Sequence, residues 1–292
     1  MIHGPFQDDL GEPAEFLLRE QPVEPVAFFA PMVLQATAKR WIDGFSGQVA
    51  FAVGSDAPDM VIANLAAAGL GAYVVADLDT PRLVRRTAPG AELRCALPLD
   101  DVAGALAVGV TGFTIDSPRD FAALVQALPL GAEVEVRGAP VGATAALLCA
   151  VRDAGFASAL TLDLGADPAM WGGQIRAAAR LATAAGVALV RLTLLGAVGA
   201  PEVLSAAVGD AMGAFGANAP ALTCVLGRAL SDTAFNLAAR AGAPGDDTGG
   251  AVPGDGRVAD FVILPLYGFS PVQTRLSGLG EVRVATVMRL HG

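Results

Sequence analysis

Four aspartates stand where strand-like apolar runs of the sequence end: Asp56, Asp77, Asp116 and Asp163. Carboxylates gathered at neighbouring strand ends can act as a general acid, a general base or metal ligands. Aspartate is also favoured at the turn from a strand to a helix, because its side chain accepts hydrogen bonds from the first backbone N–H groups of the helix. The residues leave both interpretations open: an aspartate-based reaction or helix capping.

Amine chemistry in this chain depends on one residue, because Lys39 is its single lysine. A lysine amine can form a Schiff base with a carbonyl compound. Lys39 lies in a predicted helix whose apolar stripe is formed by Leu34, Ala38, Trp41 and Phe45. At about 3.6 residues per turn, Lys39 points away from that stripe. We therefore predict a solvated surface lysine.

Histidine and cysteine chemistry is disfavoured. His3 and His291 lie at the two ends of the chain, so a histidine triad, dyad or zinc site would have to be built from the termini. Cys95, Cys149 and Cys224 are far apart in apolar contexts that suit small buried hydrophobes better than disulfides or metal ligands. We predict no metal site.

Composition bounds the class of protein. The 292 residues are 53% hydrophobic and 16% charged, which is sufficient for a large core. Acidic residues outnumber basic ones by 29 to 19, and this balance disfavours nucleic acid and anionic lipid as partners. The apolar stretches 138–151 and 211–227 are too short to span a bilayer, and the amino end lacks the pattern of a signal peptide. We expect a cytoplasmic protein with no membrane partner.

The elements that must position these residues follow a strand-helix rhythm from about residue 49 onward. The predicted strands are 48–53, 71–76, 91–96, 112–117, 132–137, 159–164, 189–195 and 221–226. The predicted helices between them include 58–69, 117–128, 144–155 and 170–186. Eight strands with intervening helices favour an α/β fold, a closed (β/α)8 TIM-like barrel, over an open sheet. Sites in such barrels lie at the carboxyl ends of the strands.

Four regions are predicted along the chain. Residues 1–25 form an N-terminal extension, and 26–239 form the barrel domain. Residues 240–257, "RAGAPGDDTGGAVPGDGR", form a Gly/Asp-rich linker whose aspartate spacing matches no calcium loop. Residues 258–292 form a residual C-terminal β region. Its strand-like runs are expected to pair with "PVAFFA", which precedes the first barrel helix, in a small sheet.

The order of these segments resembles the fold-type III pyridoxal-phosphate enzymes, the ornithine, arginine and diaminopimelate decarboxylases with their alanine racemase-like barrel. "VAFAVGSDAPDMVIANLAAAGLGAYVVAD" is similar to the family's Y-A-V-K-A-N segment with its following helix and strand, "GVTGFTIDSPRDFAAL" to its F-x-x-D-S segment, and "VLGRALSDTAF" to its E-P-G-R segment. The resemblance rests on order and spacing from Val26 to Met288. Between Ala239 and Gly254 the chain lacks most of the family's β domain and its C-D-S-x-D motif, which enters the partner subunit's active site.

The resemblance implies that the cofactor chemistry is lost. In the family a lysine holds pyridoxal phosphate, which acts as an electron sink. Gly54 stands at that lysine's place, Asp163 at the ring-stacking histidine, Val225 at the glutamate that pairs with the pyridine nitrogen, and Phe269 at a phosphate-binding tyrosine. We therefore expect no cofactor, and in particular no covalently bound pyridoxal phosphate.

Some polar groups remain at the expected barrel mouth. Gly196 and Gly199 are what is left of the family's triple-glycine phosphate cradle. Arg137 and Arg228 are expected to pair with nearby aspartates, the alternative being a ligand-binding role. The full candidate pocket consists of Asp56, Asp77, Asp116, Ser117, Arg137, Asp163, Arg228 and Phe269.

The resulting hypothesis is a catalytically inactive decarboxylase-like protein, a pseudoenzyme with a binding or regulatory role. Its expected partners are a second copy of itself, a true decarboxylase or another protein of the pathway, and a small-molecule ligand at the barrel mouth. Two alternatives stay open: a pyridoxal-phosphate-dependent amino-acid decarboxylase, and a barrel enzyme with aspartate-based chemistry.

Overall fold

The computed structural model describes residues 13–23, 25–54, 59–96, 101–138, 141–196, 199–231, 234–240, 257–258, 261–265 and 283–286. The chain divides into two compact units. One consists of Lys39–Ser55 and Gly69–Gly227, and the other of Met1–Ala38, Asp56–Ala68 and Arg228–Gly292.

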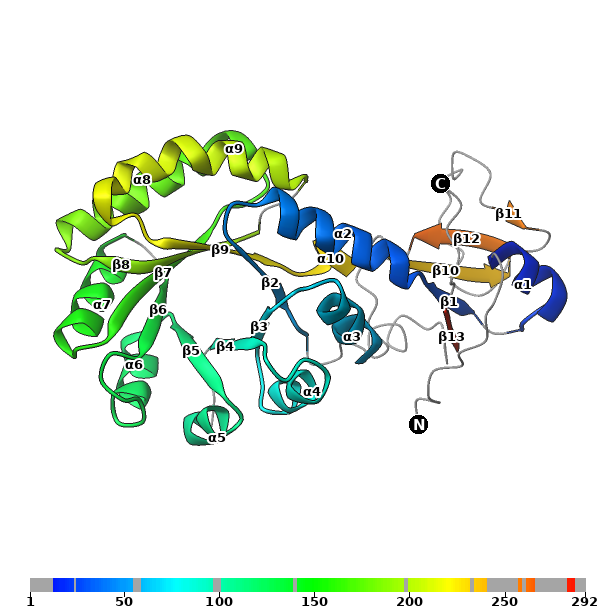
Figure 1. Ribbon diagram of the computed structural model, residues 1–292, viewed down its shortest axis with the longest axis horizontal. Helices are drawn as coiled ribbons and strands as arrows, with labels where there is room; N and C mark the ends of the chain where they lie inside the picture. Colours follow the sequence, from blue (N-terminus) through cyan, green and yellow to red (C-terminus); the bar gives the residue numbers. More distant parts are fainter. Residues whose placement is uncertain are drawn as a thin grey trace. The chain divides into compact units, whose positions relative to one another are not determined.

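The first unit contains a closed barrel of parallel strands, in which each strand pairs with the next and the last pairs with the first (Figure 1). This confirms the predicted TIM-like barrel. Each predicted strand range overlaps one strand of the barrel. The strands are β2 (Gln48–Ala52), β3 (Ala72–Val75), β4 (Glu92–Ala96), β5 (Val110–Ile115), β6 (Glu133–Arg137), β7 (Ala157–Asp163), β8 (Leu189–Leu195) and β9 (Ala221–Leu226).

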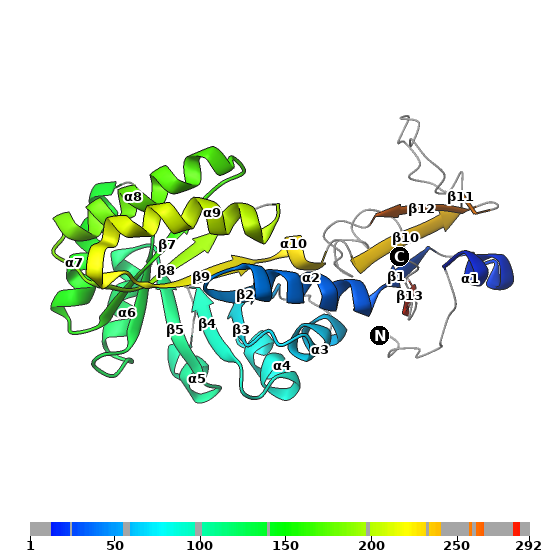
Figure 2. The ribbon, with the colours of Figure 1, turned by 45° about the horizontal axis from the view of Figure 1, so that its top comes forward.

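Helices of the same unit lie outside the barrel (Figures 1 and 2). They bury the outward side chains of the strands, such as Leu192 and Leu194 of β8, which are fully buried. Local sequence sets where they begin: Asp167 caps the longest of them, and a proline follows at its first position. The elements are α4 (Asp79–Thr87), α5 (Val102–Ala107), α6 (Pro118–Val125), α7 (Val141–Asp153), α8 (Pro168–Ala184), α9 (Pro201–Met212) and the 3-10 helix η1 (Gly213–Asn218).

The second unit contains a small sheet built from both ends of the chain, as predicted. Its strand order is β11-β12-β10-β1-β13, and β1 pairs antiparallel with β10 and parallel with β13. Phe29 of β1 stacks on Phe235 of β10, with ring centroids 4.8 Å apart. The strands are β1 (Val26–Phe29), β10 (Phe235–Arg240), β11 (Arg257–Val258), β12 (Phe261–Pro265) and β13 (Arg283–Thr286).

The remaining helices are α1 (Pro13–Glu20), α2 (Pro31–Gly44), α3 (Asp59–Ala67) and α10 (Arg228–Ser231). The N-terminal extension predicted for 1–25 thus contains a helix. The barrel strands span 48–226, so β1 and β10 of the predicted barrel segment 26–239 belong to the small sheet instead. Most of the predicted linker 240–257 lies outside the described residues.

The helix α2 has the predicted orientation. Leu34, Ala38, Trp41 and Phe45 are at most 4% exposed. The Lys39 side chain is 68% exposed, and its Nζ lies 2.9 Å from a carboxylate oxygen of Asp43 one turn later. The expectation of a solvated lysine is confirmed.

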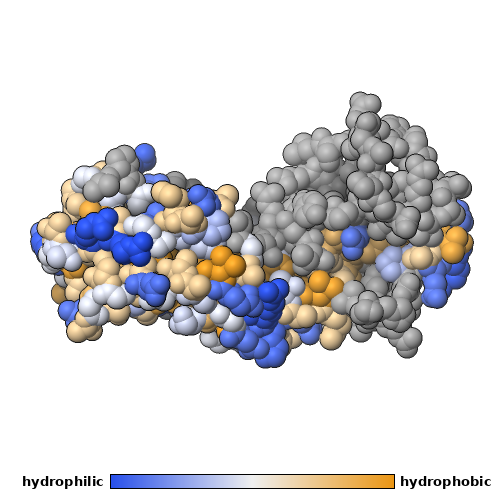
Figure 3. Space-filling model, turned by 90° about the horizontal axis from the view of Figure 1, so that it is seen from above, coloured by the Kyte–Doolittle hydropathy of each residue, from blue (hydrophilic) through white to orange (hydrophobic). Residues whose placement is uncertain are grey.

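Among the described residues, the cysteines could form disulfides, and the apolar residues could form a membrane span or an apolar surface patch. The three cysteines are free, and Cys95 and Cys224 are buried. Within the described residues, no helix is both long enough and apolar enough to cross a bilayer. On the face drawn in Figure 3, the most hydrophobic of the coloured residues form small spots, bordered by residues of intermediate hydropathy and by hydrophilic ones. Scattered apolar side chains of this kind are normal on a protein surface.

Candidate functional site

Asp77 caps a helix. It follows β3, and its Oδ1 accepts hydrogen bonds from the backbone N–H groups of Asp79 and Thr80, at 3.0 and 2.7 Å. These are the first residues of α4, so the carboxylate satisfies N–H groups that have no partner within the helix. This use of the carboxylate favours the capping interpretation of Asp77 over an aspartate-based reaction.

The end of β5 has a similar arrangement, with a serine as the capping residue. Ser117 Oγ accepts from the backbone N–H of Asp120 at 3.2 Å and donates to the Asp120 carboxylate at 2.6 Å, at the start of α6. Asp116 beside it is exposed. Arg137, at the end of β6, is exposed too. Within the described part of the chain, no ion pair joins Arg137 to Asp77, Asp116 or Asp163.

Asp163 and Gly196 lie against each other at the ends of β7 and β8. The Asp163 Oδ1 accepts from the backbone N–H of Gly165 at 3.3 Å. A Cβ on Gly196 would lie 2.7 Å from the same oxygen, and Gly196 has a positive φ of 73°. Glycine is therefore required at 196 for both space and backbone conformation. The Trp171 indole N–H donates to the Gly165 carbonyl at 3.1 Å and holds this loop onto α8.

Of the remaining predicted site positions, the structure describes Gly54, Gly199 and Val225. Gly54 is exposed shortly after β2, and Gly199 has a positive φ of 97°. Val225 is 5% exposed and packs with Ala50 and Ala72. Asp56 and Phe269 lie outside the described residues, as does the side chain of Arg228. Among the described residues, no group of three or more His, Cys, Asp or Glu side chains is arranged so that it could hold a metal ion.

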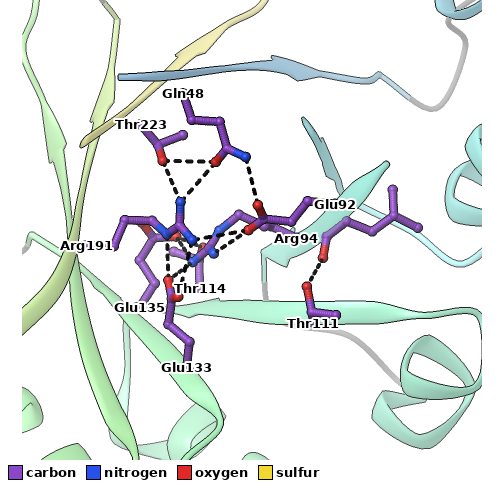
Figure 4. Close-up of polar contacts among 10 residues, drawn as sticks. Gln48, Glu92, Arg94, Thr111, Thr114, Glu133, Glu135, Arg191 and Thr223 are labelled. Atoms are coloured by element: carbon purple, nitrogen blue, oxygen red, sulfur yellow. Dashed lines mark hydrogen bonds and ion pairs between the residues drawn. The ribbon is translucent and has the colours of Figure 1, made fainter. Parts of the chain in front are cut away.

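A charged network lies inside the barrel (Figure 4), and none of its residues belongs to the predicted pocket. Arg94 of β4 is 2% exposed and binds three carboxylates: Glu133 at 2.6 Å, Glu135 at 3.2 Å and Glu92 at 3.2 Å. Arg191 of β8 also binds Glu133, at 2.9 Å. Glu92 and Glu133 are the first residues of β4 and β6, so the network lies toward the amino ends of the strands, away from the mouth.

Uncharged side chains complete this network. Arg191 Nη1 donates to Gln48 Oε1 and Thr223 Oγ1, both at 2.9 Å. Gln48 Nε2 donates to Glu92 at 2.8 Å, and Thr114 Oγ1 donates to Glu135 at 2.9 Å. Side chains of six barrel strands, β2, β4, β5, β6, β8 and β9, are thereby joined. Barrel interiors are usually filled by branched apolar residues, so this polar interior is unusual.

The network shifts the pKa values of its members. Burial acts to raise the pKa of Glu92, but the Gln48 hydrogen bond and the two arginines outweigh it and leave this pKa below its ordinary value. Burial acts to lower the pKa of Arg94, but Glu135, Glu133 and Glu92 outweigh it and raise this pKa. The interior is therefore charged at neutral pH.

This charge makes stability depend on pH. A carboxyl group whose pKa is lowered by folding stabilises the fold above its unfolded pKa, and this contribution is lost as the pH falls through the folded value. The ordinary value for Glu92 is 4.5. We expect Glu92→Gln to lower the melting temperature at pH 7, and the gap to the unmodified protein to narrow below about pH 4.5. Thermal melts from pH 7 to pH 3.5 measure this; a gap that stays constant would contradict it.

A sequence signal for the network exists. Charged residues occur at alternate positions in "ELRCA" and "EVEVR", and Arg191 is followed by Thr193 in "LVRLTLL". Alternate residues of a strand face the same side, and in a barrel one of the two sides is the interior. The pattern therefore places Glu92 with Arg94 and Glu133 with Glu135 on one side.

Comparisons with known proteins identify the fold. No protein-family model and no curated protein sequence matches the chain. Among solved structures, a lysine decarboxylase from Selenomonas ruminantium is similar over 97% of both chains, with a TM-score of 0.71 and 18% identity. The arginine decarboxylase of Paramecium bursaria Chlorella virus, bound to agmatine, matches 94% of this chain and 100% of its own, with a TM-score of 0.72 and 14% identity.

A lysine/ornithine decarboxylase from Vibrio vulnificus, complexed with putrescine, matches 79% of this chain and 72% of its own, with a TM-score of 0.63 and 16% identity. All three likenesses lie below 25% identity. The chain therefore has a decarboxylase-like fold, as the order of its segments predicted.

Proposed function

We propose that this chain is a non-catalytic protein that uses a decarboxylase-like fold for binding or regulation. The proposal rests on the absence of a lysine at the place where the family binds the cofactor. The resemblance places the cofactor lysine at Gly54, which has no side chain, and the single lysine of the chain is bound to Asp43 on the exposed face of α2. A Schiff base needs a free amine at the site of the chemistry.

The surroundings of Val225 support the same conclusion. In the family a carboxylate at this place would pair with the pyridine nitrogen and keep the ring an effective electron sink. Val225 lies in an apolar cluster with Ala50 and Ala72, against which Val74 and Leu195 also pack. Asp163 has no aromatic face to stack on a ring. The described residues therefore do not fit pyridoxal phosphate, and we derive no reaction step through it.

A titration with pyridoxal phosphate tests the proposal. We expect no saturable band in the visible spectrum and no adduct after borohydride trapping and peptide mapping, because the only lysine of the chain is exposed on α2 and bound to Asp43. Lys39→Met is the matched control, since it removes the only lysine. An adduct that persists in this variant belongs to the α-amino group. A saturable band trapped on Lys39 would overturn the proposal.

The proposed role is exercised through association, either with a second copy of the chain or with a true decarboxylase. Family members dimerise, and the fold's framework is retained here while the groups for its chemistry are not. Sedimentation analysis of the purified protein, alone and mixed with a decarboxylase of the same cell, tests this. Free monomer in every mixture would count against it.

A further inference from the structure

Four polar atoms inside the barrel have no hydrogen-bond partner within the described protein. They are Oε1 of Glu135, Nε of Arg94, and the hydroxyl oxygens of Thr161 and Thr193. All four residues are at most 3% exposed. Leaving a buried polar group without a partner costs about 1–3 kcal/mol, so each of these atoms requires an explanation.

The strand pairing places these atoms near one another. Glu135 of β6 is paired with Ala159 of β7, and Ala159 is paired with Arg191 of β8. Thr161 and Thr193 are paired with each other, two residues further along β7 and β8. Because alternate residues share a side, both threonines face the interior, as Arg191 does.

Ala159 occupies the interior position between Glu135 and Arg191. It is fully buried, and the register of the strands pairs it with both of them. Barrels commonly fill such positions with Val, Ile or Leu. A methyl group fills less of the interior there than a branched side chain would.

The chemistry of the four atoms selects the ligand. Glu135 Oε1 is an acceptor, Arg94 Nε–H is a donor, and each threonine hydroxyl is both. A metal or alkali cation would satisfy acceptors only, and an anion would satisfy donors only. Water satisfies both kinds, and a buried water typically makes about three hydrogen bonds to otherwise unsatisfied groups.

We propose that ordered water molecules are bound inside the barrel by Glu135, Thr161, Thr193 and Arg94. They extend the hydrogen-bond network of Arg94 and Arg191 from the amino ends of the strands toward the middle of β7 and β8. The barrel interior is thus a hydrated polar core. This proposal is independent of the proposed function.

Replacing the threonines with valine tests it, because the sign of the effect depends on water. If water binds the hydroxyls, Thr161→Val and Thr193→Val each remove a partner and should lower the melting temperature by about 2–4 °C. If the hydroxyls are truly unpaired, valine removes the penalty and the melting temperature rises or stays the same. Either of these results would overturn the proposal.

Thr223→Val is the matched control, since the Thr223 hydroxyl is fully buried with known partners, Arg191 and Gln48. It should lower the melting temperature in every case and sets the scale for one lost hydrogen bond. A high-resolution crystal structure of the unmodified protein gives the direct measurement. We expect water density within hydrogen-bonding distance of Glu135 Oε1 and of both threonine hydroxyls; density absent at all three would overturn the proposal.

Discussion

Arg94→Met is expected to lower the free energy of unfolding by about 3–5 kcal/mol. The guanidinium group binds Glu92, Glu133 and Glu135, and the Glu135 side chain is only 3% exposed. Methionine fills much of the same volume but has no charge. The three carboxylates would therefore lose the positive charge of the guanidinium group. Breaking a buried ion pair from one side costs more than the pair contributes, because a buried charge is left uncompensated.

Urea unfolding followed by circular dichroism measures this loss. Arg82→Met is the matched control, since its side chain is 55% exposed and its partner Asp79 is 96% exposed. Surface ion pairs of this kind contribute about 0–1 kcal/mol, so Arg82→Met should change the free energy of unfolding little. Equal losses in the two variants would show that the interior network is not what stabilises the barrel.

A second substitution separates the charge from the packing. In the Arg94→Met background, Glu135→Leu removes the most deeply buried carboxylate of the three. Replacing buried ionic partners together by apolar residues is often neutral or stabilising. We therefore expect the double variant to be more stable than Arg94→Met alone. A further loss of stability would contradict the charge-based explanation.

The elements of the barrel were predictable because each signal is local. Strand-length apolar runs and the apolar stripe of the helix that carries Lys39 each reflect the period of one element. The closed order of β2 to β9 followed from eight such runs with helices between them. The small sheet that joins β1 and β13 was expected from strand-like runs near the two ends of the chain, but no local signal gives the order or direction of its strands.

The interior network was not predictable in the same way. Arg94 meets Glu133 only because β4 and β6 both pair with β5 in a particular register, and register is a property of the closed barrel. Gly112 of β5 is paired with Arg94, and a Cβ on Gly112 would lie 2.8 Å from the Arg94 guanidinium carbon. The glycine thus makes room for the arginine, which no local pattern shows. At the mouth, likewise, the capping role of Asp77 was one of two interpretations until its contacts with α4 decided between them.

Val225→Glu is expected to lower the free energy of unfolding by about 3 kcal/mol or more. The substitution restores the residue type that the resemblance places opposite a pyridine nitrogen. Val225 is 5% exposed, and its buried neighbours in the cluster are Ala50 and Ala72. None of the residues in that cluster offers a hydrogen bond or a positive charge to a carboxylate. The new glutamate would therefore be buried among apolar side chains.

Val190→Glu on β8 is the matched control, because Val190 is 45% exposed and the carboxylate stays in water. Urea unfolding should show a large decrease in the free energy of unfolding for Val225→Glu and a small decrease for Val190→Glu. The result also bears on function. A large loss of stability would show that the surroundings of Val225 do not accept the carboxylate that the family pairs with the pyridine nitrogen. If Val225→Glu were as stable as the unmodified protein and also produced a saturable pyridoxal-phosphate band, the site would have kept its capacity for the cofactor, and the non-catalytic proposal would fail.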